Sequence, residues 1–151
     1  KHFRAFERYR ALRCSERERT APEVRVYVGT TGVGKSRSAW DEFPDLFPVP
    51  LSSKGKSDWF DGYVGQRVVL FDDYRGDEFD VGFFLKITDR YKMQVPVKGS
   101  FFPWVPEVII FTSNLHPDCW YTDCCRETRD AVLRRLNVVR TFTKDDEIVE
   151  S

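Results

Sequence analysis

Apolar residues along this chain gather in short runs that are separated by polar stretches and turns. Three runs stand out, and they are Val24–Val28, Val68–Phe71 and Val108–Phe111. Each is dominated by β-branched, aromatic or other apolar residues, which is typical of strands buried in a mostly parallel sheet. Small or polar residues follow each run directly. The pattern predicts an α/β fold whose central strands deliver polar groups to one edge of the sheet.

Three stretches have the spacing of helices. The first, residues 35–42, ends before Pro44, and the second, residues 77–90, has an acidic residue near its start as a cap. Gly82 weakens the second helix by about 1 kcal/mol. The third covers residues 126–136. The apolar positions that define the last two helices are Phe79, Phe83, Phe84 and Ile87, and then Ala131, Val132, Leu133 and Leu136; the cap of the second is Asp77 or Asp80.

Residues 91–104 alternate around Lys98-Gly99-Ser100, which predicts a β-hairpin. Pro96 and Pro103 suit edge strands, because proline lacks the N–H that a central strand needs. Two lysines and an aromatic residue at an exposed tip suit single-stranded nucleic acid, although a solvated hairpin without a ligand is the simpler interpretation.

Shorter features complete the pattern. Val49 and Leu51 suggest a short strand, and residues 138–142 suggest a final one. The aromatic turn at 59–63 is expected to pack over a strand end. The acidic residues 145–150 are expected to fray.

Residues 1–19 show a helical stripe of Phe3, Phe6, Tyr9 and Leu12 with arginines between them. So short a helix does not bury its stripe alone, so it must dock on its own domain or on a neighbouring subunit. We favour a subunit contact, because the break at Thr20-Ala21-Pro22 separates the stripe from the rest of the chain. We therefore divide the chain into a segment of residues 1–22 and a domain of residues 23–151.

Composition narrows the class of protein only partly. The chain has 151 residues with 24 Lys and Arg against 24 Asp and Glu, so net charge does not identify a partner. Residues 1–20 carry seven basic and three acidic side chains, a net of +4, which leaves −4 for the rest. Contacts with nucleic acid must therefore be local. No apolar run reaches membrane-spanning length and no signal peptide is visible. The chain begins at Lys1 without a methionine, so we expect a piece of a longer protein.

The segment between the first strand and the first helix matches G-x-x-x-x-G-K-[ST], the phosphate-binding loop of nucleotide triphosphatases. Glycines at these positions allow the backbone N–H groups to surround phosphates. The lysine ammonium binds the β- and γ-phosphates, and the serine hydroxyl is a ligand for Mg²⁺. The positive end of the helix dipole stabilises the phosphate charge further. The predicted binding residues are Gly29, Thr30, Thr31, Gly32, Val33, Gly34, Lys35 and Ser36.

Two later strands end in candidate catalytic side chains. Asp72 and Asp73 follow a buried strand about 36 residues after Lys35, as in a Walker B element. We predict that Asp72 serves Mg²⁺ together with Ser36, and that Asp73 acts as the base that orients the attacking water. Asn114 ends the next strand and would position the same water.

The four cysteines do not suggest a disulfide framework, because phosphate-loop proteins normally work in a reducing compartment. His116, Cys119, Cys124 and Cys125 resemble a zinc site on paper. Their spacing fits no standard ligand pattern, and adjacent ligands constrain the geometry badly. We expect free thiols.

Taken together these motifs resemble a superfamily 3 helicase, and more narrowly the helicase domain of replication initiator proteins (Rep) of circular single-stranded DNA viruses, the circovirus group. The resemblance covers roughly residues 23–142. It differs at Asp72–Tyr74, where relatives have DDF or DE. The segments that carry it are GTTGVGKS at 29–36, WFDGY at 59–63, VVLFDDY at 68–74, DRY with the later KG at 89–99, IIFTSN at 109–114 and the pair Arg134-Arg135.

The resemblance implies a P-loop NTPase with an AAA+-like, mostly parallel central sheet flanked by helices. It implies a ring, usually a hexamer, that uses ATP and Mg²⁺ to move 3′ to 5′ on single-stranded DNA in the host nucleus. It makes residues 1–22 an oligomerisation helix, and Lys98, Gly99 and Lys92 DNA-binding residues. Arg134 or Arg135 becomes a candidate arginine finger for the adjacent subunit.

Relatives also carry an N-terminal nicking endonuclease, which we do not find in this sequence, so we assign no nicking activity. Two other functions remain open. The first is a P-loop kinase, which would need an arginine-rich lid and an acceptor pocket. The second is a ring-forming DNA-binding scaffold without unwinding activity. A signalling GTPase is less suitable, because the sequence lacks an Asn-Lys-x-Asp motif.

Overall fold

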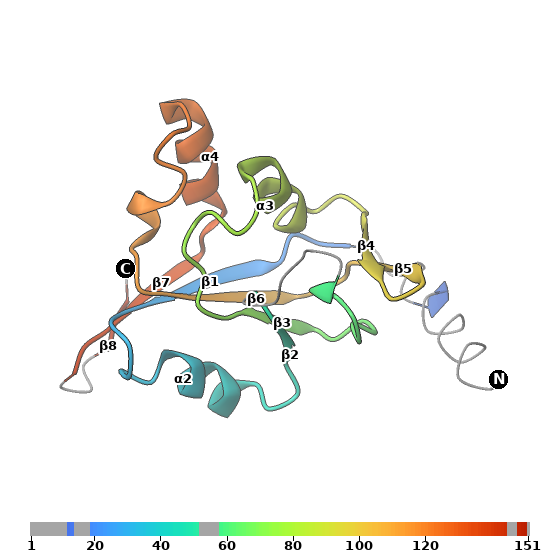
Figure 1. Ribbon diagram of the computed structural model, residues 1–151, viewed down its shortest axis with the longest axis horizontal. Coiled ribbons are helices and arrows are strands. Elements are labelled where there is room, and N and C mark those ends of the chain that lie inside the picture. Colours follow the sequence, from blue (N-terminus) through green and yellow to red (C-terminus); the bar gives the residue numbers. More distant parts are fainter. Residues whose placement is uncertain (1–11, 14–18, 52–57, 145–147, 151) are drawn as a thin grey trace.

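The computed structural model describes residues 12–13, 19–51, 58–144 and 148–150. Their centre is a six-stranded sheet in which the neighbours run in the order β2-β3-β6-β1-β7-β8 (Figure 1). All pairs are parallel except β7 with β8. The mostly parallel sheet predicted from the apolar runs is therefore confirmed. The strands are β1 (Glu23–Val28), β2 (Phe47–Val49), β3 (Val68–Phe71), β6 (Val108–Ser113), β7 (Val138–Phe142) and β8 (Ile148–Glu150).

Within the described residues three helices flank this sheet, with α2 on one face and α3 and α4 on the other (Figure 1). Their bounds are Lys35–Glu42 for α2, Val81–Ile87 for α3 and Arg126–Arg135 for α4. A short 3-10 helix, η2 (Pro117–Cys119), follows β6. Helices on both faces explain why the central strands β1, β3 and β6 are mostly buried, since both sides of the sheet are covered there.

The helix predicted at 77–90 is shorter in the structure, where α3 begins after Asp80. The Asp80 carboxylate accepts a hydrogen bond of 2.7 Å from the backbone N–H of Phe83. That bond satisfies an N–H that has no partner inside the helix, and it fixes the start of the helix at this residue. Of the two caps considered, the structure uses Asp80, so Asp77 and Phe79 precede the helix.

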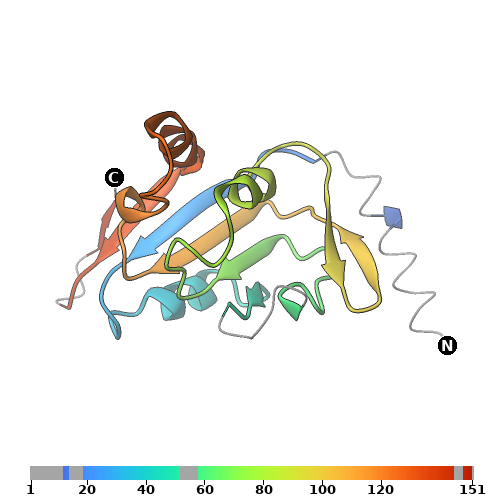
Figure 2. The same cartoon turned by 45° about the horizontal axis from the view of Figure 1, so that its top comes forward.

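The β-hairpin predicted around Lys98-Gly99 is confirmed, and it forms a separate two-stranded sheet at one end of the molecule (Figure 2). It consists of β4 (Gln94–Val97) and β5 (Ser100–Pro103). Gly99 lies in the turn with φ of 77°, a conformation that favours glycine. Because both strands are edges, the prolines at 96 and 103 cost few ladder hydrogen bonds.

Aromatic rings fill the core between the sheet and the α3 side. Phe71 of β3 and Phe111 of β6 stack with centroids 4.9 Å apart, and Phe79 packs against both. Trp59 and Phe60 are buried, as expected of an aromatic turn that packs over a strand end. Such rings bury large apolar areas, so they supply most of the core of a domain this small.

Two short segments differ from expectation. The strand expected at Val49 and Leu51 is β2, which begins earlier, at Phe47, and ends at Val49. The acidic tail does not fray throughout, because residues 148–150 pair with β7, with Ile148 opposite Phe142. The added strand protects one edge of the sheet.

Most of the predicted N-terminal helix lies outside the described residues, so its role stays a prediction. Arg19, which ends that segment, is 8% exposed. Its guanidinium donates to the carbonyl oxygens of Ile87, at 2.9 Å, and of Tyr91. The same residue therefore ties the N-terminal segment to the connection between α3 and the hairpin.

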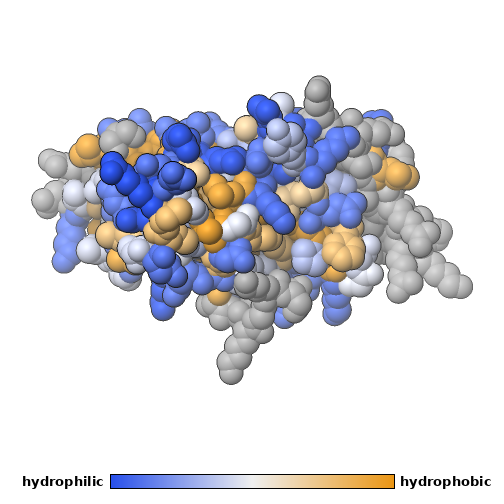
Figure 3. Space-filling model, turned by 90° about the horizontal axis from the view of Figure 1, so that it is seen from above, coloured by the Kyte–Doolittle hydropathy of each residue, from blue (hydrophilic) through white to orange (hydrophobic). Residues whose placement is uncertain are grey.

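On the face that carries α3 and α4, hydrophobic residues lie at the surface among hydrophilic ones (Figure 3). The partly buried apolar residues there include Val81, Phe83 and Leu136. In the part of the chain that the structure describes, no helix combines the length and the apolar character needed to cross a bilayer.

Candidate nucleotide-binding site

The glycine loop joins β1 to α2 in the strand–loop–helix arrangement that its sequence predicts. Gly34, at the N-terminal cap of α2, has φ of 86° and Gly32 has φ of 84°, both in the left-handed region. At Gly29 the reason for glycine is space, since a Cβ would lie 2.7 Å from the backbone oxygen of Phe142. The helix start, with its unpaired N–H groups, faces the loop and suits an anion.

Lys35 is held inside this loop and is only 6% exposed. Its ammonium donates to the carbonyl oxygen of Gly29, to that of Thr30 at 3.3 Å, and to Oδ1 of Asn114 at 2.6 Å. Burial lowers the pKa of Lys35, while the nearby carboxylates of Asp73 and Asp72 oppose that shift. The amine therefore lies beside both acids, where its positive charge would attract phosphate oxygens.

The side chains of Ser36 and Asp72, which are 36 residues apart in sequence, are hydrogen-bonded to each other. The Ser36 hydroxyl donates to Oδ1 of Asp72 at 2.6 Å, and the Thr112 hydroxyl donates to the same oxygen at 2.5 Å. Hard oxygen ligands of this kind are the set that Mg²⁺ prefers, usually with several waters retained. The chemistry of this donor set thus fits the predicted magnesium site.

Asp73 has an unusual backbone, with φ of 55°. Its N–H donates to the hydroxyl of Thr112 at 2.9 Å, and the N–H of Tyr74 donates to the Thr112 carbonyl at 2.8 Å. A non-glycine residue in this region costs on the order of 1 kcal/mol, so these two bonds hold it there. The Asp73 side chain is exposed at the edge of the sheet, beside Lys35.

The strand order explains why residues so distant in sequence converge. β6 lies between β1 and β3, with Val28 beside Ser113 and Phe71 beside Phe111. The phosphate loop after β1, the acids after β3 and Asn114 after β6 therefore reach one edge together, as in other open parallel sheets. The structure brings together all the sequence-predicted nucleotide residues from the strand ends.

The two candidate arginine fingers lie elsewhere, on the last turn of α4. Arg135 pairs with Asp89, with Nη1 and Oδ1 3.5 Å apart. Arg134 is exposed, and no ion pair connects it to another of the described residues. Neither contributes to the nucleotide edge of its own chain, so a role at that edge would need a second copy.

The predicted DNA-binding residues belong to the hairpin. Lys98 and Gly99 form its turn and are exposed. Lys92 precedes β4, so Met93 and the four residues of that strand separate it from Lys98 by about 20 Å along the chain. Phe101 of β5 is 63% exposed, which makes it the aromatic side chain that the turn presents to solvent. The structure places Lys98 with Phe101 and does not place Lys92 beside them.

Sequence reasoning missed Thr112, which contacts both acids. The only signal was its place two residues before Asn114, and a threonine inside an apolar strand ordinarily indicates packing. It also missed two hollows. One, of about 660 Å³, lies outside the phosphate loop against Arg37, Phe142 and Lys144. The other, of about 360 Å³, lies between η2 and α4.

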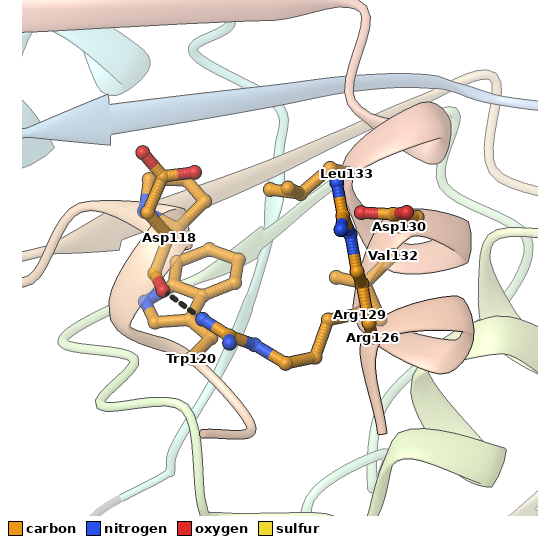
Figure 4. Close-up of a pocket in the computed structure, with 8 residues that line it drawn as sticks. Asp118, Trp120, Arg126, Arg129, Asp130, Val132 and Leu133 are labelled. Atoms are coloured by element: carbon orange, nitrogen blue, oxygen red, sulfur yellow. Dashed lines mark hydrogen bonds between the residues drawn. The ribbon is translucent and has the colours of Figure 1, made fainter. Parts of the chain in front are cut away.

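In the second hollow Arg129 extends from α4 and donates to the backbone carbonyl of Asp118 at 2.6 Å (Figure 4). Arg126 and Asp130 of the same helix also line it, with Trp120 on the other side. The arginine thus joins α4 to the segment that follows β6. It lies outside every predicted motif, which explains why no pattern pointed to it.

The cysteines in the described part of the chain, Cys119, Cys124 and Cys125, are free thiols. No three His, Cys, Asp or Glu side chains are grouped there in a way that would hold a metal ion. Cys14 lies outside the described residues. His116 instead accepts a hydrogen bond of 3.2 Å from the backbone N–H of Asp118, so its ring caps η2.

A family model described as RNA helicase matches residues 26–115, which cover the phosphate loop, both acids and Asn114. The chain belongs to this helicase family. Its relatives include the replication-associated protein of Pigeon circovirus, 44% identical over 117 residues. That alignment covers 76% of this chain and 34% of the relative.

Two other replication-associated proteins extend the comparison. That of Goose circovirus is 39% identical over 146 residues, covering 94% of this chain and 46% of the relative. That of Porcine circovirus 1 is 34% identical over 123 residues, covering 78% and 36%. The chain spans less than half the length of these curated relatives. The resemblance to the superfamily 3 helicase domain of circovirus-like replication proteins is confirmed.

Proposed function

We propose that this chain is the ATP-dependent DNA helicase domain of a viral replication initiator. The observation that carries the proposal is the convergence of Lys35, Asp72, Asp73 and Asn114 at one edge of the sheet. The 2.6 Å bonds from Lys35 to Asn114 and from Ser36 to Asp72 join three strand ends into one site. A phosphate-binding loop, an acid pair and a polar sensor in contact are what nucleotide hydrolysis requires.

In the proposed mechanism ATP is the substrate. Lys35 exchanges its bonds with loop carbonyls for bonds with the β- and γ-phosphates, and the loop N–H groups surround those phosphates. A magnesium ion, when bound near Ser36 and Asp72, neutralises phosphate charge. Asp73 accepts a proton from the attacking water, and Asn114 orients that water. The hollow of about 660 Å³ outside the loop offers room for the rest of a nucleotide.

The proposed assembly is a ring with an AAA+-like arrangement of subunits. In the helicase family that the chain resembles, such rings are usually hexamers. Arg134 or Arg135 of one subunit completes the ATP site of its neighbour, which suits residues that do not reach their own site. Residues 1–22 form the oligomerisation segment and residues 23–151 the ATPase domain. The buried guanidinium of Arg19 supports a firm connection between the two.

Single-stranded DNA is the proposed partner of the β4–β5 hairpin. Lys98 and Gly99 lie in its exposed turn, where a lysine would pair with a phosphate and the glycine would allow close approach. Exposed Phe101 would stack on a base. Lys92, which precedes β4, would contact the DNA strand farther along its backbone. From the resemblance to circovirus replication proteins, the proposed place of action is the host nucleus.

Two observations weigh against the alternatives. A kinase needs an acceptor pocket besides its nucleotide pocket, and the hollow against the loop, lined by Arg37 and Phe142, is already taken by the proposed nucleotide. A scaffold without hydrolysis would not need Asp73 in a left-handed conformation beside Lys35. The helicase alone uses the acids, the asparagine and the hairpin together.

The direct test is ATP hydrolysis and strand displacement by the wild type and by Lys35→Ala, in the presence of single-stranded DNA. We expect Lys35→Ala to lose hydrolysis, by 10²-fold or more on the scale of about 10² to 10³ per electrostatic contact, while its thermal unfolding stays cooperative. Lys86→Ala, on an exposed turn of α3, is the control and should hydrolyse ATP as the wild type does. Wild-type turnover in Lys35→Ala would refute the proposed site. Hydrolysis without strand displacement would instead support the scaffold, and phosphoryl transfer to an added acceptor the kinase.

A further inference from the structure

Thr112 is a fully buried residue of β6, with 0% of its surface exposed. A hydroxyl in such a place must find partners, because an unpaired buried polar group is costly. Thr112 finds two, and both belong to the acid pair. Its hydroxyl donates to Oδ1 of Asp72 at 2.5 Å and accepts from the N–H of Asp73 at 2.9 Å.

At Asp72, both hydrogen bonds go to the same carboxylate oxygen. Its Oδ1 accepts from both Thr112 and Ser36, at 2.5 and 2.6 Å. Two donors on one oxygen fix the rotation of the carboxylate and leave the other oxygen, Oδ2, for the water shell of a bound ion. Outer partners that orient ligating groups in this way govern metal affinity nearly as much as the ligands do.

At Asp73, Thr112 acts on the backbone conformation. Two groups of Thr112 act there, since its hydroxyl binds the N–H of Asp73 and its carbonyl binds the N–H of Tyr74 at 2.8 Å. Those bonds surround the residue whose φ is 55°. The direction in which the Asp73 carboxylate leaves the sheet therefore depends on a residue of the neighbouring strand.

We propose that Thr112 is a positioning residue for both acids of the site: its hydroxyl orients Asp72 toward the magnesium ion and its backbone and hydroxyl together aim Asp73 at the attacking water. The inference rests on the proposed function. It adds a residue that touches neither nucleotide nor ion. Thr112 of β6 thus supports the acids, while Asn114, directly after this strand, contacts Lys35.

The test compares Thr112→Val, which keeps the β-branched shape and removes the hydroxyl, with Thr112→Ser, which keeps the hydroxyl. The first readout is the magnesium concentration needed for half-maximal binding of a non-hydrolysable ATP analogue. The second is kcat for ATP hydrolysis at saturating magnesium. We expect Thr112→Val to raise the magnesium requirement by about 10- to 100-fold and to lower kcat, as outer-shell changes do. Thr112→Ser should stay close to the wild type on both, because it keeps the hydroxyl.

Thr88→Val is the matched control, because Thr88 is also buried, at 2%, and its hydroxyl donates to the carbonyl of Phe84 far from the acids. We expect it to lower thermal stability and leave the magnesium requirement unchanged. If Thr112→Val does not fold, Thr112→Cys takes its place, and its weaker donor should give an intermediate rise in the requirement.

Three results would overturn the inference. One is a magnesium requirement in folded Thr112→Val or Thr112→Cys equal to that of the wild type. Another is equal impairment of Thr112→Val and Thr112→Ser, which would indicate packing alone. The third is the same rise in Thr88→Val. Failure of the wild type itself to bind the analogue with magnesium would refute the proposed nucleotide site instead, so the two failures are distinguishable.

Discussion

Nη1 of Arg135, on the last turn of α4, lies 3.5 Å from Oδ1 of Asp89, in the segment that leads to the β4–β5 hairpin. The two side chains are 31% and 29% exposed. The pair joins an arginine that we consider for catalysis in a neighbouring subunit to the base of the proposed DNA-binding element. Arg134, one residue earlier, is exposed and makes no such contact with the described residues.

The two arginines should therefore differ in their effect on stability. We expect Arg135→Ala to lower the free energy of unfolding by up to about 1 kcal/mol, the range for partly exposed ion pairs, and Arg134→Ala to leave it unchanged. Urea unfolding of each variant measures this. A double-mutant cycle with Asp89→Ala should show coupling only with Arg135. The finger is the arginine whose substitution lowers ATP hydrolysis in the assembled ring for a reason other than lost stability. Its substitution either leaves stability unchanged or still lowers hydrolysis after Asp89→Ala restores the stability.

The same pair predicts a dependence on pH. Burial alone would raise the pKa of Asp89, but the backbone N–H of Arg90 and the guanidinium of Arg135 outweigh it and hold the pKa below its ordinary value. A lowered carboxyl pKa gives stability that is present above about pH 4, the unfolded value, and is lost as the pH falls through the folded value. The difference in unfolding free energy between the wild type and Asp89→Asn should therefore shrink as the pH is lowered from 6 to about 3. A constant difference over that range would contradict it.

Asn114 should separate binding from hydrolysis. In the structure its Oδ1 accepts from Lys35 at 2.6 Å, so the amide competes with phosphate for the ammonium. We expect Asn114→Ala to lower kcat by about 10²-fold, because the attacking water loses its orientation. The affinity for ATP should stay equal or rise slightly. Equilibrium binding and single-turnover hydrolysis give the two numbers, and a large loss of affinity with unchanged kcat would contradict the assignment.

The hairpin should hold DNA by charge at one residue and by stacking at another. Lys98→Ala should reduce the slope of log K against log salt by about 0.7 for single-stranded DNA, since one phosphate contact is lost. Phe101→Ala should weaken binding by about 1–3 kcal/mol while the slope is unchanged, because stacking releases no counterion. Fluorescence anisotropy at several salt concentrations measures both.

Lys86→Ala is the control for the hairpin, since this lysine is exposed on α3 outside β4 and β5. It should change neither affinity nor salt slope. Basal ATP hydrolysis should be the same in all three variants. A Lys98→Ala protein with the wild-type salt slope would remove the hairpin turn from the DNA-binding surface.

Gly29 should tolerate no larger residue. A Cβ there would lie 2.7 Å from the backbone oxygen of Phe142 and 2.8 Å from Cγ2 of Val33. We expect Gly29→Ala to destabilise the fold by about 1–3 kcal/mol, as overpacking does, and to displace the loop from the phosphates. Thermal unfolding and nucleotide binding measure the two effects. Lys86→Ala, exposed on α3, should retain both stability and nucleotide binding, and shows that the effects belong to the glycine.

The sequence predicted most of the site because its parts lie at strand ends. β1, β3 and β6 each carry a buried apolar run, so the residues that follow these runs are visible in the pattern, and parallel strands share one edge. Helix ends were harder. The start of α3 depends on one hydrogen bond to Asp80, and Asp77 offered an equal choice.

Contacts across the sheet were not predictable. Thr112 reads as an ordinary strand residue, and its role depends on the register that places β6 beside β3. The pairing of β8 with β7 was missed for a similar reason, because its acidic surroundings gave no strand signal. Arg135 and Asp89 are separated by 46 residues, and nothing in their local patterns connects them.

The aromatic core behind the acids has a spectroscopic consequence. Tyr74 directly follows Asp73, and its ring packs edge-on against the indole of Trp120 with centroids 4.9 Å apart. Trp120 is buried, at 2% exposure. Indole emission responds to small displacements of nearby rings and dipoles, so a shift of the acids on loading with magnesium and nucleotide should change its intensity. Because the chain has four tryptophans, a variant in which Trp40, Trp59 and Trp104 are replaced by phenylalanine would let Trp120 emission report loading in real time without a label.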